Sequence, residues 1–314
     1  MKHKVSINDL NPEHIKNFQS VLELTKNYAS RPNRLSSWIF RGQEDKKWDL
    51  TTNLERQLND FNWSLKKTPE IEKGFLRKFR RHCENYIQNT PDWGNYMEWF
   101  ALMRHYGAPT RLLDCTYSVF VALFFAVEKA HCDFTLWAFN AKGMDKRACE
   151  VLGPDKSRLV KRGQNYDPNL QFEEDFCTIF SSRSRKKFVL PMNPYKFNER
   201  LVVQQGVFLC PGDISEKFED NLVNMFDSPG ELNNCVKKYI FTYNVKLKKE
   251  ILFYLQKMNM NRATLFPGLE GFACSLNSFL SFPEVTTVLP KDSRYVTNRY
   301  NARWPKSKKK IIRK

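Results

Sequence analysis

A short run near the N-terminus, Trp38–Gln43, constrains the fold of this chain more than any other segment. Its aromatic and β-branched residues favour a β-strand. The run contains Arg41 followed by Gly42, and a glycine at such a point lets another group approach the backbone closely. A guanidinium fixed there can bind two phosphate oxygens at once. We therefore expect a strand that presents an arginine to a phosphate-bearing ligand.

Two further segments combine polar residues with a glycine. In the first, His105–Thr116, Gly107 and Pro109 are expected to end a helix and to release an extended stretch. A buried helix over Val119–Val127 should follow. The second segment, Arg200–Phe208, is predicted to be a strand. We expect all three segments to converge on one cleft, because polar, glycine-punctuated strand ends are poor choices for a core alone.

The composition indicates a folded protein with an anionic partner. Of the 314 residues, 41% are hydrophobic, with 25 Phe, 12 Tyr and 7 Trp, which excludes disorder for most of the chain. The formal net charge of +17 favours nucleic acid, a phosphorylated ligand or an acidic protein as partner. The longest apolar run, Val119–Val127, is too short to span a bilayer. The polar N-terminus has no secretory pattern, so we expect a cytoplasmic protein without a membrane partner.

The motif inventory excludes several kinds of site. The eight cysteines are scattered without a Cys-x-x-Cys pair, which argues against a zinc site and against a disulfide framework. We therefore expect no metal. The chain also lacks Gly-x-Gly, a Walker A run, His-Glu-x-x-His and Gly-x-Ser-x-Gly. Nucleotide chemistry here would need a scaffold other than the Rossmann, P-loop or kinase type.

The remaining pattern predicts an α+β fold with a mixed sheet. We expect a helical N-terminal segment over residues 1–35, beginning at Asn11–Glu13, then one domain over 36–290 and a basic tail over 291–314. A second helix should begin at Thr68. Its core side is expected at Ile71, Phe75, Phe79 and Tyr86. Further helices are expected over 95–106 and near 174–181, and a strand over Phe134–Phe139.

Together the three segments resemble the FRG domain family, named for the Phe-Arg-Gly motif found here at Phe40–Gly42. The resemblance covers roughly residues 36–210, from that motif through His105–Thr116 to Arg200–Phe208. The segment Ala263–Gly271 is similar to the closing motif of the family and extends the resemblance to about residue 280.

A strand that carries aromatic-Arg-Gly also resembles the first NAD-contacting strand of the arginine-type ADP-ribosyltransferases. This resemblance implies an ADP-ribosyltransferase-like fold, NAD as co-substrate and a role for Arg41 in holding the dinucleotide phosphates. Alignment on Gly206 places Arg200 near the position where those enzymes carry a catalytic glutamate. A catalytic acid would then have to come from another position in the chain, and Asp114 and Glu270 are the candidates.

The resemblance implies ADP-ribosyl transfer in a bacterial toxin or anti-phage defence effector, and the net charge of +17 favours nucleic acid as the acceptor, RNA more than DNA. The residues expected to act in catalysis are Arg41, Asp114 and Gln205. The residues expected to contact NAD are Phe40, Arg41, Gly42, Gln43, His105, Tyr106, Thr110, Arg111, Thr116 and Gln204. Single-stranded RNA is the expected partner, and an antitoxin or other regulatory protein is a further candidate.

Other interpretations stay open at the level of sequence. The missing strand glutamate favours a non-catalytic module that binds a nucleotide or RNA, and a protein could be the ADP-ribose acceptor. A metal-dependent nuclease would use Asp114, Glu199 and Glu270, although no clustered carboxylate spacing supports it. Structurally, Asp114 could instead form an ion pair with Arg41 or with Arg111.

Overall fold

The computed structural model describes residues 5–29, 38–154, 176, 178–180, 185–194 and 199–279. The basic tail over 291–314 lies outside the described residues, as does much of the helix expected near 174–181, of which 176 and 178–180 are helical. No helix in the described ranges combines the length and the apolar character needed to cross a membrane.

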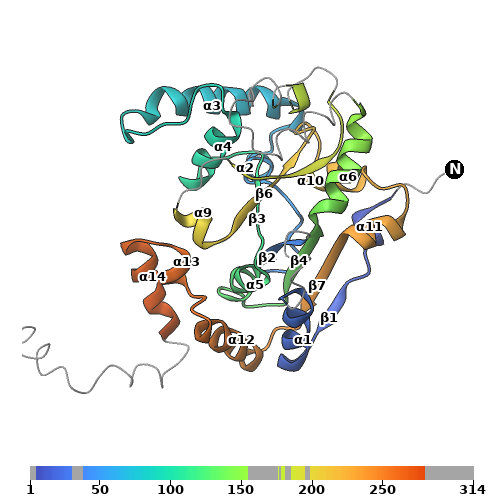
Figure 1. The fold of residues 1–314 in the computed structure, drawn as a ribbon, viewed down its shortest axis with the longest axis vertical. Coiled ribbons are helices and arrows are strands. Elements are labelled where there is room, and N and C mark those ends of the chain that lie inside the picture. Colours follow the sequence, from blue (N-terminus) through green and yellow to red (C-terminus); the bar gives the residue numbers. More distant parts are fainter. Residues whose placement is uncertain are drawn as a thin grey trace, which may run out of the picture.

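Seven strands of the described chain form one mixed sheet in the order β1-β7-β4-β2-β3-β6-β5 (Figure 1). The strands are β1 (Glu13–Ile15), β2 (Trp38–Gln43), β3 (Leu113–Thr116), β4 (Phe134–Asn140), β5 (Val189–Met192), β6 (Gly206–Pro211) and β7 (Val236–Phe241). β1 runs parallel to β7, and the other neighbouring strands are antiparallel. The expected α+β class with a mixed sheet is confirmed.

The helices of the described chain lie on both sides of this sheet. They are α1 (Phe18–Ala29), α2 (Asn53–Asp60), α3 (Thr68–Cys83), α4 (Tyr96–His105), α5 (Val119–Val127), α6 (Ala141–Leu152), α9 (Glu199–Val203), α10 (Phe218–Val223), α11 (Pro229–Cys235), α12 (Val245–Lys257), α13 (Arg262–Leu265) and α14 (Leu269–Phe279). Two short 3-10 helices, η1 (Ile7–Asp9) and η3 (Leu65–Lys67), complete them. Side chains of Asn95 and Ser118 accept backbone N–H groups at the starts of α4 and α5, which fixes where these helices begin.

The sheet is nearly divided between β2 and β3. β2 pairs with β4 along its whole length, and β3 pairs with β6 at all four of its residues. Between β2 and β3, however, a single pair of residues is in register, Phe40 and Thr116. The sheet therefore has two halves, β1-β7-β4-β2 and β3-β6-β5. We call the gap that opens beyond the Phe40–Thr116 pair the sheet split.

Alternation along the strands divides the core into two apolar layers. On β4, Leu136 and Ala138 face the layer that contains α5, whereas Trp137 and Phe139 face the other layer. The helices α1, α5 and α12 pack on one another and belong to the first layer (Figure 1). α5 is buried over nearly its whole length, which confirms the buried helix expected at these positions.

Gly42 allows α5 to lie against β2. A β-carbon added at Gly42 would lie 2.1 Å from the carbonyl oxygen of Ala122 and 2.5 Å from the backbone nitrogen of Ala126. These are backbone atoms of a packed helix, so they cannot move aside as a flexible side chain could.

Replacing Gly42 with alanine is therefore expected to lower the free energy of unfolding by about 2 kcal/mol, in the range seen for overpacked cores. Urea denaturation of the full chain measures this change. Gly74 is a matched control, because nothing lies within 4 Å of a β-carbon added there. Equal stability changes at the two glycines would contradict the close approach.

The N-terminal segment differs from the helical segment expected over residues 1–35. Glu13–Ile15 forms β1, which pairs with β7, and the helix begins at Phe18 instead of near Pro12. Asn17 is the residue that caps it, since its side chain accepts the backbone N–H of Ser20 at 2.9 Å. Asn11 gave the stronger capping pattern in the sequence because it precedes a proline, but the strand partner lies more than 200 residues away and cannot be seen locally.

The strand expected over Arg200–Phe208 is wrong in its first half. Glu199–Val203 is the helix α9, and β6 begins only at Gly206. Gln205 between them adopts the left-handed conformation with φ 47°. The β-branched pair near the end of α9 favours a strand locally, but tertiary contacts decide otherwise, since the Leu201 side chain packs where a β-carbon at Gly206 would lie.

The buried face of α3 is rotated from the expected one. The expected core residues Phe75 and Tyr86 are 41% and 84% exposed. The buried residues of α3 are Thr68, Glu72, Leu76, Arg80 and Cys83. Two of these are charged, and the sequence gives no local sign that they have partners in the core.

Candidate anion-binding site

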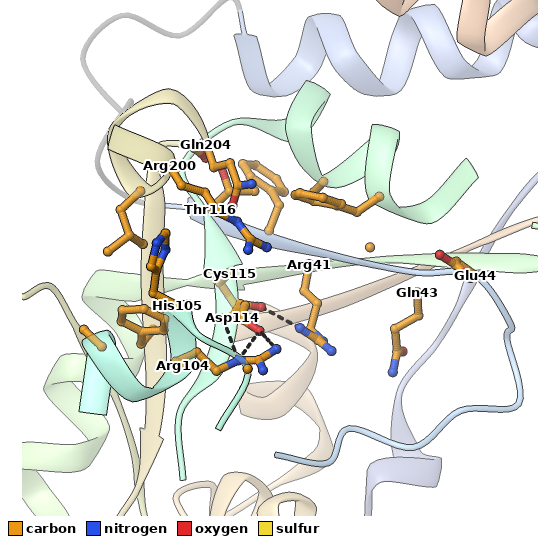
Figure 2. A pocket seen from close by; sticks show the side chains of 18 of the residues that line it. Arg41, Gln43, Glu44, Arg104, His105, Asp114, Cys115, Thr116, Arg200 and Gln204 are labelled. Atoms are coloured by element: carbon orange, nitrogen blue, oxygen red, sulfur yellow. Dashed lines mark hydrogen bonds and ion pairs between the residues drawn. The ribbon is translucent and has the colours of Figure 1, made fainter. Parts of the chain in front are cut away.

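A pocket of about 440 Å³ opens at the sheet split (Figure 2). β2, β3 and β6 contribute lining residues from the sheet, and α2, α4, α5, α9 and the loop after β2 contribute the others. Its volume lies in the range of sites for small ligands. The pocket is formed where backbone pairing between two strands stops, so polar side chains face it.

The three segments singled out in the sequence converge on this pocket, which confirms the expected common cleft. The residues of the expected site that line it are Phe40, Arg41, Gly42, Gln43, His105, Asp114, Thr116 and Gln204. Four others do not line it, namely Tyr106, Thr110, Arg111 and Gln205. Of the two neighbouring glutamines, Gln204 faces the pocket and Gln205 lines a separate one on the other side of the Phe40–Thr116 pair.

Arg41 spans the sheet split. Its backbone pairs with β4 opposite Trp137, and its Nη1 donates to the carbonyl oxygen of Asp114 on β3 at 2.7 Å. The Nε of Arg41 is buried and has no hydrogen-bond partner among the described residues. Burial lowers the pKa of Arg41 below its ordinary value, although the nearby charge of Asp114 acts in the opposite direction. A buried cation with an unused donor indicates a group that an anion could satisfy.

Asp114 is held by a second arginine. Arg104, near the end of α4, donates Nε to both carboxylate oxygens of Asp114, at 3.0 and 2.9 Å, and its Nη2 donates to one of them as well. Burial alone would raise the pKa of Asp114, but Arg104 and, less strongly, Arg41 and Arg200 hold that pKa below its usual value. Asp114 is therefore ionised at neutral pH, and its side chain is 43% exposed to the pocket. The expected ion pairs of Asp114 with Arg41 or Arg111 are replaced by one with Arg104.

Positive charge exceeds negative charge in the pocket lining. Arg41, Arg56, Arg104 and Arg200 line the pocket, and the acidic residues there are Asp114 and Glu44. Arg200 stacks on the ring of Phe266 with 4.4 Å between the guanidinium carbon and the ring centroid. This contact fixes Arg200 in place while its charge faces the cavity (Figure 2). The arrangement suits an anion that carries more than one charge.

His105 lies beside Arg200 in the same pocket (Figure 2). Burial, with a further contribution from the charge of Arg200, lowers the pKa of His105 below 6.5. The imidazole is therefore neutral at pH 7 and can accept a proton. His105 is the last residue of α4, so the end of this helix positions its ring.

Three of the expected ligand contacts are used in holding the pocket together. The amide of Gln43 accepts from Trp137 Nε1 and donates to the carbonyl of Asp49 at 3.1 Å. The hydroxyl of Thr116 donates to the carbonyl of Gln204 at 2.6 Å, and the amide of Gln204 donates to the carbonyl of Leu265 at 2.7 Å. The Gln43 bonds thus tie β2 to β4 and to the loop at Asp49, whereas the other two bonds link β3 to α13 through Gln204, just after α9.

Arg111 is buried in the core and does not line the pocket. Its Nε donates to both oxygens of Glu72 at 2.9 Å, and the two side chains are 5% and 4% exposed. Thr110 is fully buried, and Tyr106 is 60% exposed outside the pocket. Burial raises the pKa of Cys115 to about 12, so its thiol is protonated at neutral pH and is a poor nucleophile.

The carboxylates considered for a nuclease lie apart. Glu199 begins α9 and Glu270 lies in α14; both are exposed, and neither lines the pocket. Within the described ranges, no group of three His, Cys, Asp or Glu side chains is arranged to hold a metal ion.

Sequence reasoning missed Arg56, Arg104 and Glu44 as lining residues. Arg104 and Glu44 adjoin residues that were singled out, His105 and Gln43, so proximity to the motifs could have indicated them. Arg56 lies on α2, and no sequence signal connects it with the site.

Residues 36–133 match the family model of the FRG domain. The match supports an FRG domain over this segment, about a third of the chain. The matched segment includes β2, β3 and the helices α2–α5, and so it carries Arg41, Arg104 and Asp114. Arg200 and Gln204 lie beyond it, so the pocket combines FRG-domain residues with later ones. No match was found among curated proteins or among solved structures.

Proposed function

We propose that the pocket at the sheet split binds the diphosphate of NAD and that the protein transfers ADP-ribose from it. The observation that carries this proposal is the group of four arginines around a pocket in which Asp114 compensates one of them. A diphosphate carries the negative charges and the paired oxygens that guanidinium groups bind best.

Arg41 is the central residue of this proposal. It lies in the middle of the sheet split with a buried, unused Nε among the described residues. Removing a cation from water is costly unless it is paired. An anion between Arg41 and Arg200 would offset that cost, and this supports Arg41 as the main phosphate ligand.

The chemistry requires that the bond between the nicotinamide nitrogen and ribose C1′ breaks. Nicotinamide leaves as a neutral base with the electron pair, and the acceptor forms a new bond to C1′ and releases a proton. His105 lines the pocket and is neutral at pH 7, which supports it as the group that would take that proton. Asp114 remains ionised and faces the pocket, where it would stabilise positive charge developing on the ribose.

Nucleic acid, RNA more than DNA, is the acceptor we propose, and a toxin or defence effector is the biological setting that this activity suits. The support is electrostatic, since the net charge is +17. Lys73, Arg77, Lys78 and Arg81 are exposed along α3 beside the 41% exposed ring of Phe75. Basic groups interspersed with an aromatic ring are typical of surfaces that bind single strands.

One observation favours a non-catalytic binding module instead. Asp114 is engaged on both oxygens by Arg104, and the expected catalytic glutamate position is occupied by Arg200 on a helix. Such a pocket could hold a nucleotide without reaction. A protein acceptor is the other alternative, and the same experiment separates all three.

The test offers NAD labelled in its adenylate phosphate to the full chain, together with RNA, DNA and a protein mixture. We expect label on nucleic acid, predominantly RNA. The Arg41→Lys variant should lose transfer, because a lysine cannot span the sheet split with two donors. Arg147→Lys is the control, since Arg147 pairs with surface carboxylates on α6 and α11 and lies outside the pocket.

Label on protein alone would overturn the nucleic-acid acceptor. NAD that binds without release of nicotinamide would support the binding module. Transfer by Arg41→Lys at the wild-type rate would refute the role of Arg41.

A further inference from the structure

The pocket extends past the end of β2 to two residues that the diphosphate does not require. Glu44 directly follows β2, and Trp48 lies four residues later; both line the pocket. Figure 2 shows Glu44 on the opposite side of Arg41 from His105 and Arg200. Besides its arginines, the pocket lining thus includes a carboxylate and an indole from the segment that follows β2.

The loop that carries Trp48 is fixed on both sides. The backbone N–H of Lys46 donates to the carbonyl of Asp133 at 2.8 Å, and its ammonium pairs with the same residue at 3.0 Å. On the other side, the carbonyl of Asp49 accepts from Gln43 at 3.1 Å. Trp48 nevertheless has 51% of its surface exposed. An indole held open on an anchored loop offers a flat stacking surface at little entropic cost.

Glu44 carries a carboxylate that other residues do not use. Among the described residues, no hydrogen bond or ion pair engages its side-chain oxygens, whereas Asp114 in the same pocket is held by Arg104. Like Asp114, the nearby Glu128 is paired with an arginine, since Arg262 donates to both of its carboxylate oxygens at 2.6 and 2.7 Å. Burial raises the pKa of Glu44, and the positive charges of Lys129 and Arg262 partly oppose that shift. An open carboxylate in a cationic pocket suits a ligand that brings hydroxyl donors.

We propose that Trp48 and Glu44 form a ribonucleoside half-site, in which Trp48 stacks on the base and Glu44 accepts hydrogen bonds from the ribose hydroxyls. A carboxylate is a common acceptor for the ribose 2′-hydroxyl in nucleotide sites. Glu44 follows Arg41 by three residues, about 10 Å of extended backbone, and both line the pocket with Arg56, so phosphates attached to that ribose would extend toward Arg41 or Arg56. The direction of the phosphates rests on the proposed function; the contacts to base and ribose do not.

Isothermal titration of the full chain with ADP, 2′-deoxy-ADP and inorganic pyrophosphate tests this half-site. We expect ADP to bind about tenfold more tightly than 2′-deoxy-ADP, as for one hydrogen bond to a charged acceptor. Glu44→Ala should remove that difference and leave pyrophosphate binding unchanged. Trp48→Ala should weaken both nucleotides and spare pyrophosphate.

Two matched controls lie outside the pocket. Trp63 is 52% exposed, nearly the same as Trp48, and Glu84 is an exposed glutamate at the end of α3. Alanine at either position should change none of the three affinities. Unchanged pyrophosphate binding also shows that the Glu44 and Trp48 variants are folded.

Equal affinity of the unmodified chain for ADP and 2′-deoxy-ADP would overturn the half-site, as would the absence of binding by all three ligands. Loss of pyrophosphate binding in Glu44→Ala would also contradict it, since the carboxylate would then act on the phosphates. The proposed transfer fails separately. If the chain prefers ADP to 2′-deoxy-ADP but transfers nothing from NAD, the proposed transferase activity is refuted and the half-site is supported. If the chain transfers ADP-ribose but does not distinguish the two nucleotides, the half-site is refuted and the transferase activity is supported.

Discussion

Replacing Arg41 with methionine is expected to abolish the proposed ADP-ribosyl transfer and to weaken ADP binding by about 2–3 kcal/mol, the value of hydrogen bonds to a charged group. The free energy of unfolding should change by less than about 1 kcal/mol, because replacing a buried charge with an apolar side chain of similar volume is often neutral. The variant loses the hydrogen bond from Nη1 to the Asp114 carbonyl, which lowers stability. It also no longer buries an incompletely paired cation, which raises stability by a similar amount. Titration calorimetry and urea denaturation measure the two quantities.

Arg104→Met is the informative comparison, because both arginines line the same pocket. Asp114 would lose its bidentate partner. Since that carboxylate is 43% exposed, we expect a stability loss of about 1–2 kcal/mol, reduced from the cost at a fully buried site. A large stability loss in Arg41→Met with ADP binding intact would show that Arg41 is structural.

Replacing Glu72 with glutamine is expected to lower the free energy of unfolding by about 3–5 kcal/mol, the cost of leaving one member of a buried ion pair without its partner. Glu72 and Arg111 are nearly inaccessible, and Glu72 also accepts the backbone N–H of Arg111 at 3.3 Å. Urea denaturation at neutral pH measures the loss. Pyrophosphate binding should be unchanged wherever the variant is folded, since neither residue lines the pocket at the sheet split.

Glu70→Gln supplies the control on the same helix. Glu70 is exposed at the start of α3, so its replacement should change stability by less than about 0.5 kcal/mol. A stable Glu72→Gln variant that no longer binds pyrophosphate would reverse the assignment and return Arg111 to the set of ligand contacts.

The sequence predicted those elements whose signal is local. β2, the end of α4 and the buried α5 follow from strand propensity, a glycine followed by proline, and a continuous apolar run. The convergence of the motifs was also predictable, because each motif places polar residues where a core would exclude them. Phosphate binding by Arg41 stays a prediction.

The predictions that were wrong share a different cause. In each case the residues that determine the local structure or the burial are brought into contact by the fold and are not recognisable from the neighbouring sequence. Phe75 looked like a core residue by its chemistry, but Glu72 and Arg80 fill the buried face of α3 because their partners are brought there by the fold. The strand predicted at the position of α9 is wrong for the same reason, because tertiary contacts outweigh the local strand preference of its residues. Nothing near Asp114 in sequence shows that Arg104, and not Arg111, would be its partner, since both lie within ten residues.

The nearly divided sheet bears on what the FRG segment can be as a physical unit. Residues 36–133 contribute one strand to each half, β2 and β3, and these two share a single residue pair. The strands that complete the halves, β4 and β6, come later in the chain. Cut out alone, the segment would expose both edges of β2 and β3, and isolated strands with so little pairing are not stable in water. The matched segment therefore encloses part of the pocket lining, while the sheet that completes it extends from β1 to β7.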